Sequence, residues 1–220
     1  ENMSLSPYLI PKARAGYRLG HGELIDSMIQ DGLWDVYNDK HMGNCAEICA
    51  RENNYTRKAQ DLIAIESYSR AQNAQIRGLF KNEIVSVSVP QRKGDIIDII
   101  EDEEPSKAKF EKLTSLRPAF ENNGTITAAN ASKINDGAAA LLIANSRSLD
   151  KEKTKNSFQI ISQSSFAQEP ESFTTAPIYA IKKVLKKARL NSNDIDLWEI
   201  NEAFAPVVMS AVDEFKLDWD

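Results

Sequence analysis

The stretch of sequence that decides the fold reads NNGTITAANASKINDGAAA and covers residues 122–140. Small residues follow one another in it, so another segment or a ligand could approach the backbone closely. Its polar side chains Asn130, Ser132, Asn135 and Asp136 surround a tight turn before an alanine-rich run. From the residues alone two interpretations are open, a structural turn packed under a helix and a ligand-binding loop.

From Gly124 onward the sequence predicts strands and helices in alternation. The apolar and β-branched runs favour buried strands. The expected strands are residues 125–127, 138–144, 158–164 and 197–200. Thr175 can cap a helix that carries Pro177 in its first turn, and another helix is expected from about Glu202 to Phe215. Strands that alternate with helices pair in parallel through right-handed crossovers, so this half is predicted to be α/β.

The half of the chain before Gly124 predicts helices and loops. Residues 44–77 contain neither glycine nor proline and favour two helices, broken at residues 53–55, with Thr56 as the N-cap of the second. Around them the glycine, proline and charged residues predict less regular structure. The expectations there are a surface loop over residues 1–22, a short helix from Glu23 to about Gln30, a strand over residues 83–89 and a solvated, acidic loop over residues 91–124.

Composition and charge narrow the classes of partner. The 220 residues carry a net charge of −5 with scattered basic residues, which argues against nucleic acid or an anionic membrane as a partner. The sequence contains no apolar run of about 18 residues, so no membrane span is predicted. Cys45 and Cys49 are the only cysteines, too few for a secreted disulfide framework, so a reduced, cytoplasmic location is expected. Neither end reads as a natural terminus, and both are expected to be cut.

A second informative position lies in the stretch LWEINEAFA at residues 197–205. Asn201 stands where the predicted strand ends and the predicted helix begins, and this is where open α/β sheets bind ligands. A side-chain amide there can donate a hydrogen bond to an oxyanion, directly or through a water. The alternative is an asparagine that caps a helix or closes a turn.

His41, Cys45 and Cys49 are spaced four residues apart and would share one face of a helix. Such a face could suggest a metal site, but Gly43 weakens a helix at this point and a fourth ligand is missing. The pattern favours buried, reduced cysteines instead, and no metal is expected. A nucleophilic cysteine needs a nearby base, usually histidine. The chain therefore offers supporting groups without a convincing nucleophile.

Seven segments together resemble the thiolase family, and within it the acetoacetyl-CoA thiolases (acetyl-CoA C-acetyltransferases). They follow one another in the family's order and cover nearly the whole chain. They are ENMS (residues 1–4), DGLWDVY (31–37), HMGNCAE (41–47), LRPAF (116–120), GTITAANAS (124–132), NDGAAA (135–140) and NEAF (201–204). The resemblance implies an α/β, thiolase-like layered fold that is incomplete and carries an inserted helical loop domain.

The resemblance also implies domains and an activity. Residues 1–122 would be mostly a loop domain that covers coenzyme A, residues 123–150 the end of the N-terminal half, and residues 151–220 the start of the C-terminal half. The implied reaction condenses two acetyl-CoA molecules to acetoacetyl-CoA and coenzyme A, or runs in reverse, through an acyl-cysteine. The coenzyme A thioester is the substrate, no separate cofactor is implied, and the full-length protein is expected to be a homo-oligomer.

Site residues follow from the same resemblance. Asn201 would hold a water that stabilises the enolate oxygen of the thioester, which makes it the implied catalytic residue. Pro105 stands where potassium-binding relatives have an aromatic ligand, which argues against a potassium site, although three backbone carbonyls could still contribute to one. These carbonyls belong to Ala128, Ala129 and Ala131. Lysines that could meet the phosphates, unless they are only solvated, are Lys107, Lys109 and Lys112. The implied substrate-binding residues are His41, Met42, Phe120, Ala128, Ser132, Ala203 and Phe204.

The reactive cysteines of the family match no residue of this chain. The resemblance places the nucleophilic cysteine upstream of Glu1, and the second cysteine with a glycine-histidine-proline loop downstream of Asp220. Neither Cys45 nor Cys49 matches a catalytic position, so the chain alone is expected to be inactive. The alternatives are a non-catalytic coenzyme-A-binding or assembly protein of thiolase descent and a metal-binding helical module.

Overall fold

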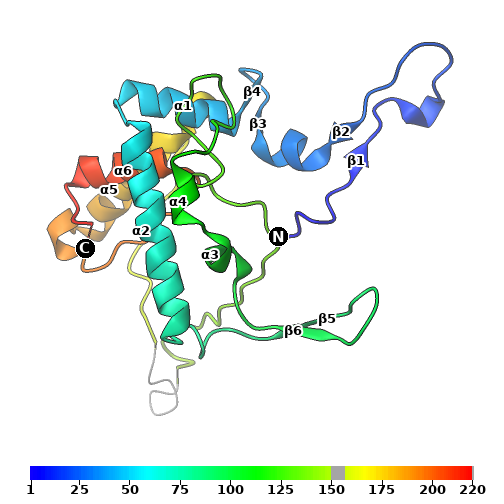
Figure 1. Cartoon of the computed structure of the whole chain (residues 1–220). Coiled ribbons are helices and arrows are strands. Elements are labelled where there is room, and N and C mark those ends of the chain that lie inside the picture. The colour runs from blue at the N-terminus through cyan, green and yellow to red at the C-terminus, as the bar shows by residue number, and fades with distance from the viewer. Residues whose placement is uncertain (150–156, 220) are drawn as a thin grey trace.

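A computed structural model of the chain describes residues 1–149 and 157–219. In Figure 1 the long helix α2 runs through the centre, α1, α5 and α6 gather around one end of it, and two hairpins project away from this body. Up to residue 149 the elements are β1 (Tyr8–Leu9), η1 (Ala13–Ala15), β2 (Ile25–Asp26), η2 (Ile29–Leu33), β3 (Trp34–Asp35), β4 (Lys40–His41), α1 (Met42–Glu52), α2 (Arg57–Ile76), β5 (Val87–Val89), β6 (Ile97–Ile99), α3 (Glu103–Lys107) and α4 (Phe110–Leu113). From residue 157 they are η3 (Pro170–Thr175), α5 (Ala176–Ala188), η4 (Ser192–Asp194) and α6 (Ala205–Phe215).

The two helices predicted over residues 44–77 are confirmed as α1 and α2. α2 begins at Arg57 because the Thr56 hydroxyl accepts a hydrogen bond from the Ala59 N–H at 3.2 Å, which satisfies an amide that the first turn leaves unpaired. Between the helices the chain turns a corner, where Asn54 has a left-handed φ of 57°. The predicted break and the predicted cap are therefore both correct.

The helix predicted after Thr175 is confirmed as α5, which begins at Ala176 with Pro177 in its first turn. Thr175 nevertheless makes no side-chain cap. Its hydroxyl donates to the Ser172 carbonyl at 3.1 Å instead, so the preceding 3-10 turn leads directly into the helix.

The last predicted helix is confirmed as α6, but it begins at Ala205 and not at Glu202. Phe204 is extended, with φ −149° and ψ 151°, and forms an antiparallel bridge with Ala131. Because this bridge holds the backbone out of the helical conformation, the first helical turn forms only beyond it.

The parallel sheet predicted for the second half is wrong within the described residues. Their strands form three antiparallel pairs, β1 with β2, β3 with β4 and β5 with β6. None of the four runs predicted as strands after Gly124 belongs to these pairs. Ile126 and Thr127 are buried as expected, whereas Leu142 is 99% exposed. A strand needs a hydrogen-bonded neighbour, and the described residues provide none for these runs.

Three predictions in the first half also need correction. The helix expected from Glu23 to about Gln30 forms only from Ser27, where it leads into the π-helix η2, because Ile25 and Asp26 pair with β1. Of the strand expected over residues 83–89 only β5 forms, and it pairs with β6. The acidic loop expected over residues 91–124 contains β6, α3 and α4, since the Asp102 carboxylate caps α3 by accepting from the Glu104 N–H at 3.0 Å.

The hydrophobic core lies where α1, the start of α6 and residues 124–132 meet. Ala46, Ile126, Phe204 and Val207 are buried together there. No helix among the described residues combines the length and the apolar character that crossing a bilayer requires. The domain boundary expected at residues 122/123 stays a prediction, and the one expected at 150/151 lies outside the described residues.

Candidate functional site

Residues 124–132, called the anchored turn below, are held from α1 by one buried carboxylate. Glu47 is 1% exposed, and its two oxygens accept hydrogen bonds from the Thr125 N–H at 2.7 and 2.9 Å, the Thr125 hydroxyl at 2.8 Å and the Ile126 N–H at 2.7 Å. Charge-assisted bonds of this kind are among the stronger ones in proteins. The close approach needs glycine at position 124, since a Cβ there would stand 2.3 Å from Glu47 Oε1.

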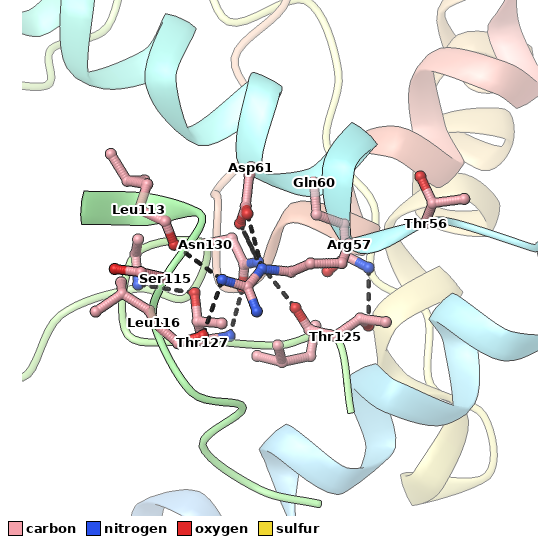
Figure 2. Close-up of polar contacts among 12 residues, drawn as sticks. Thr56, Arg57, Gln60, Asp61, Leu113, Ser115, Leu116, Thr125, Thr127 and Asn130 are labelled. Carbon is pink, nitrogen blue, oxygen red and sulfur yellow. Dashed lines mark hydrogen bonds and ion pairs between the residues drawn. The ribbon is translucent and has the colours of Figure 1, made fainter. Parts of the chain in front are cut away.

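A second set of polar contacts holds the anchored turn from α2 (Figure 2). Arg57 Nε donates to both oxygens of Asp61 at 2.9 and 2.7 Å, and Asp61 is 3% exposed. Asn130 Nδ2 donates to Asp61 Oδ1 at 3.2 Å, while Asn130 Oδ1 accepts from the Thr127 N–H at 2.8 Å. Gln60 Nε2 reaches the Thr125 hydroxyl at 2.9 Å. The turn is thus packed against two helices, as the first of its two interpretations required.

The anchored turn also contacts the stretch that contains Asn201. Ala131 and Phe204 form the antiparallel bridge, the Ser132 N–H donates to the Ala203 carbonyl at 2.9 Å, and the Ala205 N–H donates to the Asn130 carbonyl at 2.9 Å. The two informative stretches of the sequence, separated by about seventy residues, therefore lie against each other.

Five of the predicted substrate-binding residues form one cluster beside this contact. The rings of His41 and Phe120 stack with their centroids 4.7 Å apart, and Phe120 meets Phe204 edge to face at 6.0 Å. Met42 and Ala203 pack against the same core. Phe204 is only 7% exposed, so it supports the cluster from behind.

Two hollows flank the anchored turn, and each is lined by one of the two remaining predicted substrate-binding residues. The serine hollow has a volume of about 210 Å³ and contains Ser132 and Ser67 in its wall. The lysine hollow has a volume of about 260 Å³ and contains Ala128 in its wall. Tyr68 and Lys133 line both hollows, and the lysine hollow is also lined by Lys107, Lys109 and Lys112.

Asn201 lies in a third and larger hollow of about 970 Å³, which Trp198 and Phe215 also line. The residue is exposed, and within the described part of the chain its side chain has no hydrogen-bond partner. It precedes α6 by four residues in a segment that is not a strand, so the predicted strand-to-helix junction is wrong in detail. The neighbouring Glu202 is fixed, because its carboxylate accepts from the Ser67 hydroxyl at 2.7 Å.

Two family descriptions match this sequence, "Thiolase, N-terminal domain" over residues 1–147 and "Thiolase, C-terminal domain" over residues 154–220. The chain belongs to the thiolase family. This confirms the resemblance that the seven segments indicated. Together the two matched ranges cover nearly the whole chain.

Several curated relatives of this thiolase chain are named acetyl-CoA acetyltransferases. One from Schizosaccharomyces pombe is 45% identical over 219 residues, which are 99% of this chain and 55% of the relative. Acetyl-CoA acetyltransferase 2 from Arabidopsis thaliana is 46% identical over 213 residues, which are 96% of this chain and 53% of the relative. The chain spans about half the length of the curated relatives it matches.

Solved thiolase structures resemble the fold as well. The acetyl-CoA acetyltransferase of Bacillus anthracis superposes with a TM-score of 0.91 at 34% identity, over 99% of this chain and 55% of that one. The Acat5 thiolase of Ascaris suum, solved in complex with coenzyme A, gives a TM-score of 0.86 at 38% identity over the same shares. The predicted thiolase-like fold is confirmed for the part that this chain covers.

The two cysteines of this thiolase chain lie in the core of α1. Burial raises the pKa of both the Cys45 and the Cys49 thiol, so they are protonated at neutral pH. The His41 ring points elsewhere, because its Nδ1 accepts from the Gly43 N–H at 2.9 Å and caps the helix. Within residues 1–149 and 157–219, no three side chains of His, Cys, Asp or Glu converge as a metal site would require.

His41 predicts a pH-dependent stability for this thiolase. Burial lowers the pKa of His41 below its ordinary value of 6.5, because the charged ring loses hydration. The unfolded chain then binds the proton more tightly than the folded chain. The stability that neutral His41 contributes is therefore complete above pH 6.5 and is lost as the pH falls through the folded pKa. Denaturant midpoints measured from about pH 7.5 down to pH 5.5, above most carboxylate titrations, should fall. His41→Asn keeps a capping side chain and should flatten that slope; equal slopes in the two proteins would contradict the assignment.

Several residues of this thiolase site were missed by the sequence reasoning. The spacing of four residues between Arg57 and Asp61 on a predicted helix was a usable signal for their ion pair. Glu47 also gave a hint, since it stands between two cysteines predicted to be buried. Tyr68 and Lys133 gave none, because their shared position depends on how α2 and the anchored turn pack.

Proposed function

We propose that this chain forms the coenzyme A cover and an oxyanion-stabilising group of an acetyl-CoA C-acetyltransferase. The enzyme would condense two acetyl-CoA molecules to acetoacetyl-CoA and coenzyme A, or run the reverse thiolysis, through an acyl-cysteine. The single observation that carries the proposal is the contact between the anchored turn and residues 203–205. It joins the two polar stretches beside the serine hollow, while Ala128 and Ala129 of the same turn line the lysine hollow.

The lysine hollow suits the phosphates of coenzyme A. Lys107 is neutralised by Glu103 at 2.9 Å and Glu104 at 3.2 Å. Lys109 and Lys112 have no carboxylate partner within the described residues, so their charges remain available to an anion. The small side chains of the anchored turn continue from there, and a long thin pantetheine arm needs small residues and few donors.

The cluster around Phe120 suits the acyl end of the thioester. His41, Met42 and Phe120 present apolar or neutral surface, because burial disfavours the charged form of His41. Phe204 fixes Phe120 from behind at 6.0 Å. A short acyl group meets no charged side chain in this wall, which supports a small, uncharged acyl substrate.

Asn201 is suited to stabilising the enolate oxygen of the thioester. Its amide is free to orient a water whose O–H donates to the enolate oxygen, and such donors stabilise the charge that develops in the transition state. Cys45 and Cys49 are buried and protonated, which supports a reactive thiolate supplied by residues outside this chain. We further propose a cytoplasmic homo-oligomer, supported by the reduced cysteines and by exposed apolar side chains on the β5–β6 hairpin.

The test is thiolysis of acetoacetyl-CoA by the full-length natural protein that contains this chain. Asn201→Ala should lower kcat about 100-fold with little change in the affinity for coenzyme A. The 220-residue chain alone should release no coenzyme A above a boiled control. Turnover by the isolated chain would overturn the assignment of the thiolates to other residues.

Asn193→Ala is the matched control, because Asn193 lines the same hollow as Asn201 and should leave kcat unchanged. Equal losses in the two variants would remove the oxyanion role from Asn201. A full-length protein that binds coenzyme A but never turns over would favour the alternative, a non-catalytic coenzyme-A-binding protein.

A further inference from the structure

Lys133 places a positive charge on the outer face of the anchored turn. Its ammonium group donates a hydrogen bond to the Ala128 carbonyl and stands 5.9 Å from the centroid of the Tyr68 ring. The side chain is half-buried and lines both the serine hollow and the lysine hollow. The Ala128 carbonyl, the Lys133 ammonium and the Tyr68 ring thus lie together between the two hollows.

Four N–H groups of the turn are already hydrogen-bonded within the protein. The N–H groups of Thr125 and Ile126 donate to Glu47, and that of Thr127 donates to Asn130 Oδ1. The Ala129 N–H donates to the Thr127 hydroxyl at 3.2 Å. With these four N–H groups engaged, the Ala128 carbonyl is left to accept from Lys133, and a backbone oxygen together with an aromatic face is chemistry that attracts a monovalent cation.

We propose that Lys133 is a tethered monovalent cation. Its ammonium holds the place in which the Ala128 carbonyl and the Tyr68 ring would otherwise attract an alkali ion such as potassium. The coenzyme A site is therefore independent of alkali ions. This inference rests on the proposed function only where coenzyme A binding is measured, because the contacts of Lys133 with Ala128 and Tyr68 belong to the fold.

The surrounding charges agree with a tethered cation. Lys109 and Lys112 line the same hollow, and like charges repel a free cation that arrives from solvent. A lysine bound through its own backbone avoids the entropy that a free ion loses on binding. An ammonium also has three donors, of which one reaches Ala128 and the others can point to Tyr68 and to a ligand in the hollow.

The experiment compares potassium, sodium and choline chlorides at one ionic strength on the full-length natural protein. The wild type should show the same thermal midpoint and the same coenzyme A affinity in all three salts. Lys133→Ala opens the space, so its coenzyme A affinity in choline chloride should fall about tenfold. Potassium should restore that affinity saturably and raise the midpoint of the variant. Choline, whose quaternary ammonium is much larger than a potassium ion, should do neither.

Two further variants separate the explanations. Lys133→Arg keeps a cation at this position and should stay insensitive to potassium. Lys109→Ala removes a lysine of the same hollow that does not reach the turn, so any loss of affinity should be equal in every salt. A wild type that needs potassium, or a Lys133→Ala protein that loses affinity equally in every salt, overturns the proposal. A potassium requirement of the wild type overturns the proposal even if Lys133→Ala fails to fold, and the midpoint needs no turnover, so failure of the proposed activity stays distinguishable.

Discussion

Replacing Glu47 with alanine should lower the free energy of unfolding by about 3–5 kcal/mol, the range expected when buried polar groups lose a charged partner. The carboxylate is 1% exposed and accepts from the Thr125 N–H, the Thr125 hydroxyl and the Ile126 N–H. Alanine leaves those donors without their acceptor, and the Ile126 N–H lies in the core. Denaturant unfolding of the full-length protein measures the loss.

The size of that loss decides whether the anchored turn depends on this residue. Typical domains are stable by only about 5–15 kcal/mol, so a change of this size removes a large share. Glu47→Gln keeps the shape and one acceptor oxygen and should lose less. Glu52→Ala, at the exposed end of the same helix, should change stability by less than about 0.5 kcal/mol. A Glu47→Ala protein as stable as Glu52→Ala would show that the turn is held by the contacts from α2 alone.

Replacing Gly43 with alanine should lower the stability of the protein and distort the cluster around Phe120 that we propose contacts the acyl group. A Cβ at position 43 would stand 2.3–2.4 Å from three atoms of the Phe120 ring. The ring cannot simply retreat, because His41 stacks on it at 4.7 Å and Phe204 meets it at 6.0 Å. Overpacking of this kind costs about 1–3 kcal/mol or more, which exceeds the gain of about 1 kcal/mol from alanine's helix propensity. Unfolding curves and coenzyme A affinity measure the two effects.

Gly32→Ala is the matched control, since a Cβ at that glycine meets nothing within 4 Å. It should leave both stability and affinity unchanged. The double variant Gly43→Ala with Phe120→Ala relieves the clash, so its loss should be smaller than the sum of the two single losses. If Gly43→Ala behaves like Gly32→Ala, the packing of Phe120 against α1 is looser than the structure indicates.

Predictions from local sequence succeeded where the interactions are local. Residues 44–77 became two helices because alanine and long side chains favour a helix without outside help, and Thr56 caps the second within its own first turn. The strands predicted after Gly124 failed for the opposite reason. An apolar run becomes a strand only when another segment pairs with it, and the described residues provide no such segment.

The candidate site divides in the same way. His41, Met42, Phe120, Ala203 and Phe204 were expected from motifs alone, and the structure brings them into one cluster. Ala128 and Ser132 were named in the same way but lie in separate hollows, which no motif indicated.

By itself the sequence determined the family, the helical core of the first half and the small residues of the anchored turn, since each is carried by contiguous residues. The tertiary structure alone decided that Glu47 and Asp61 hold that turn and that Lys133 faces Tyr68 across it. The Glu47–Thr125 and Lys133–Tyr68 contacts join residues more than sixty positions apart. Their energies come from burial and from the distances between charges, which exist only after the helices have packed.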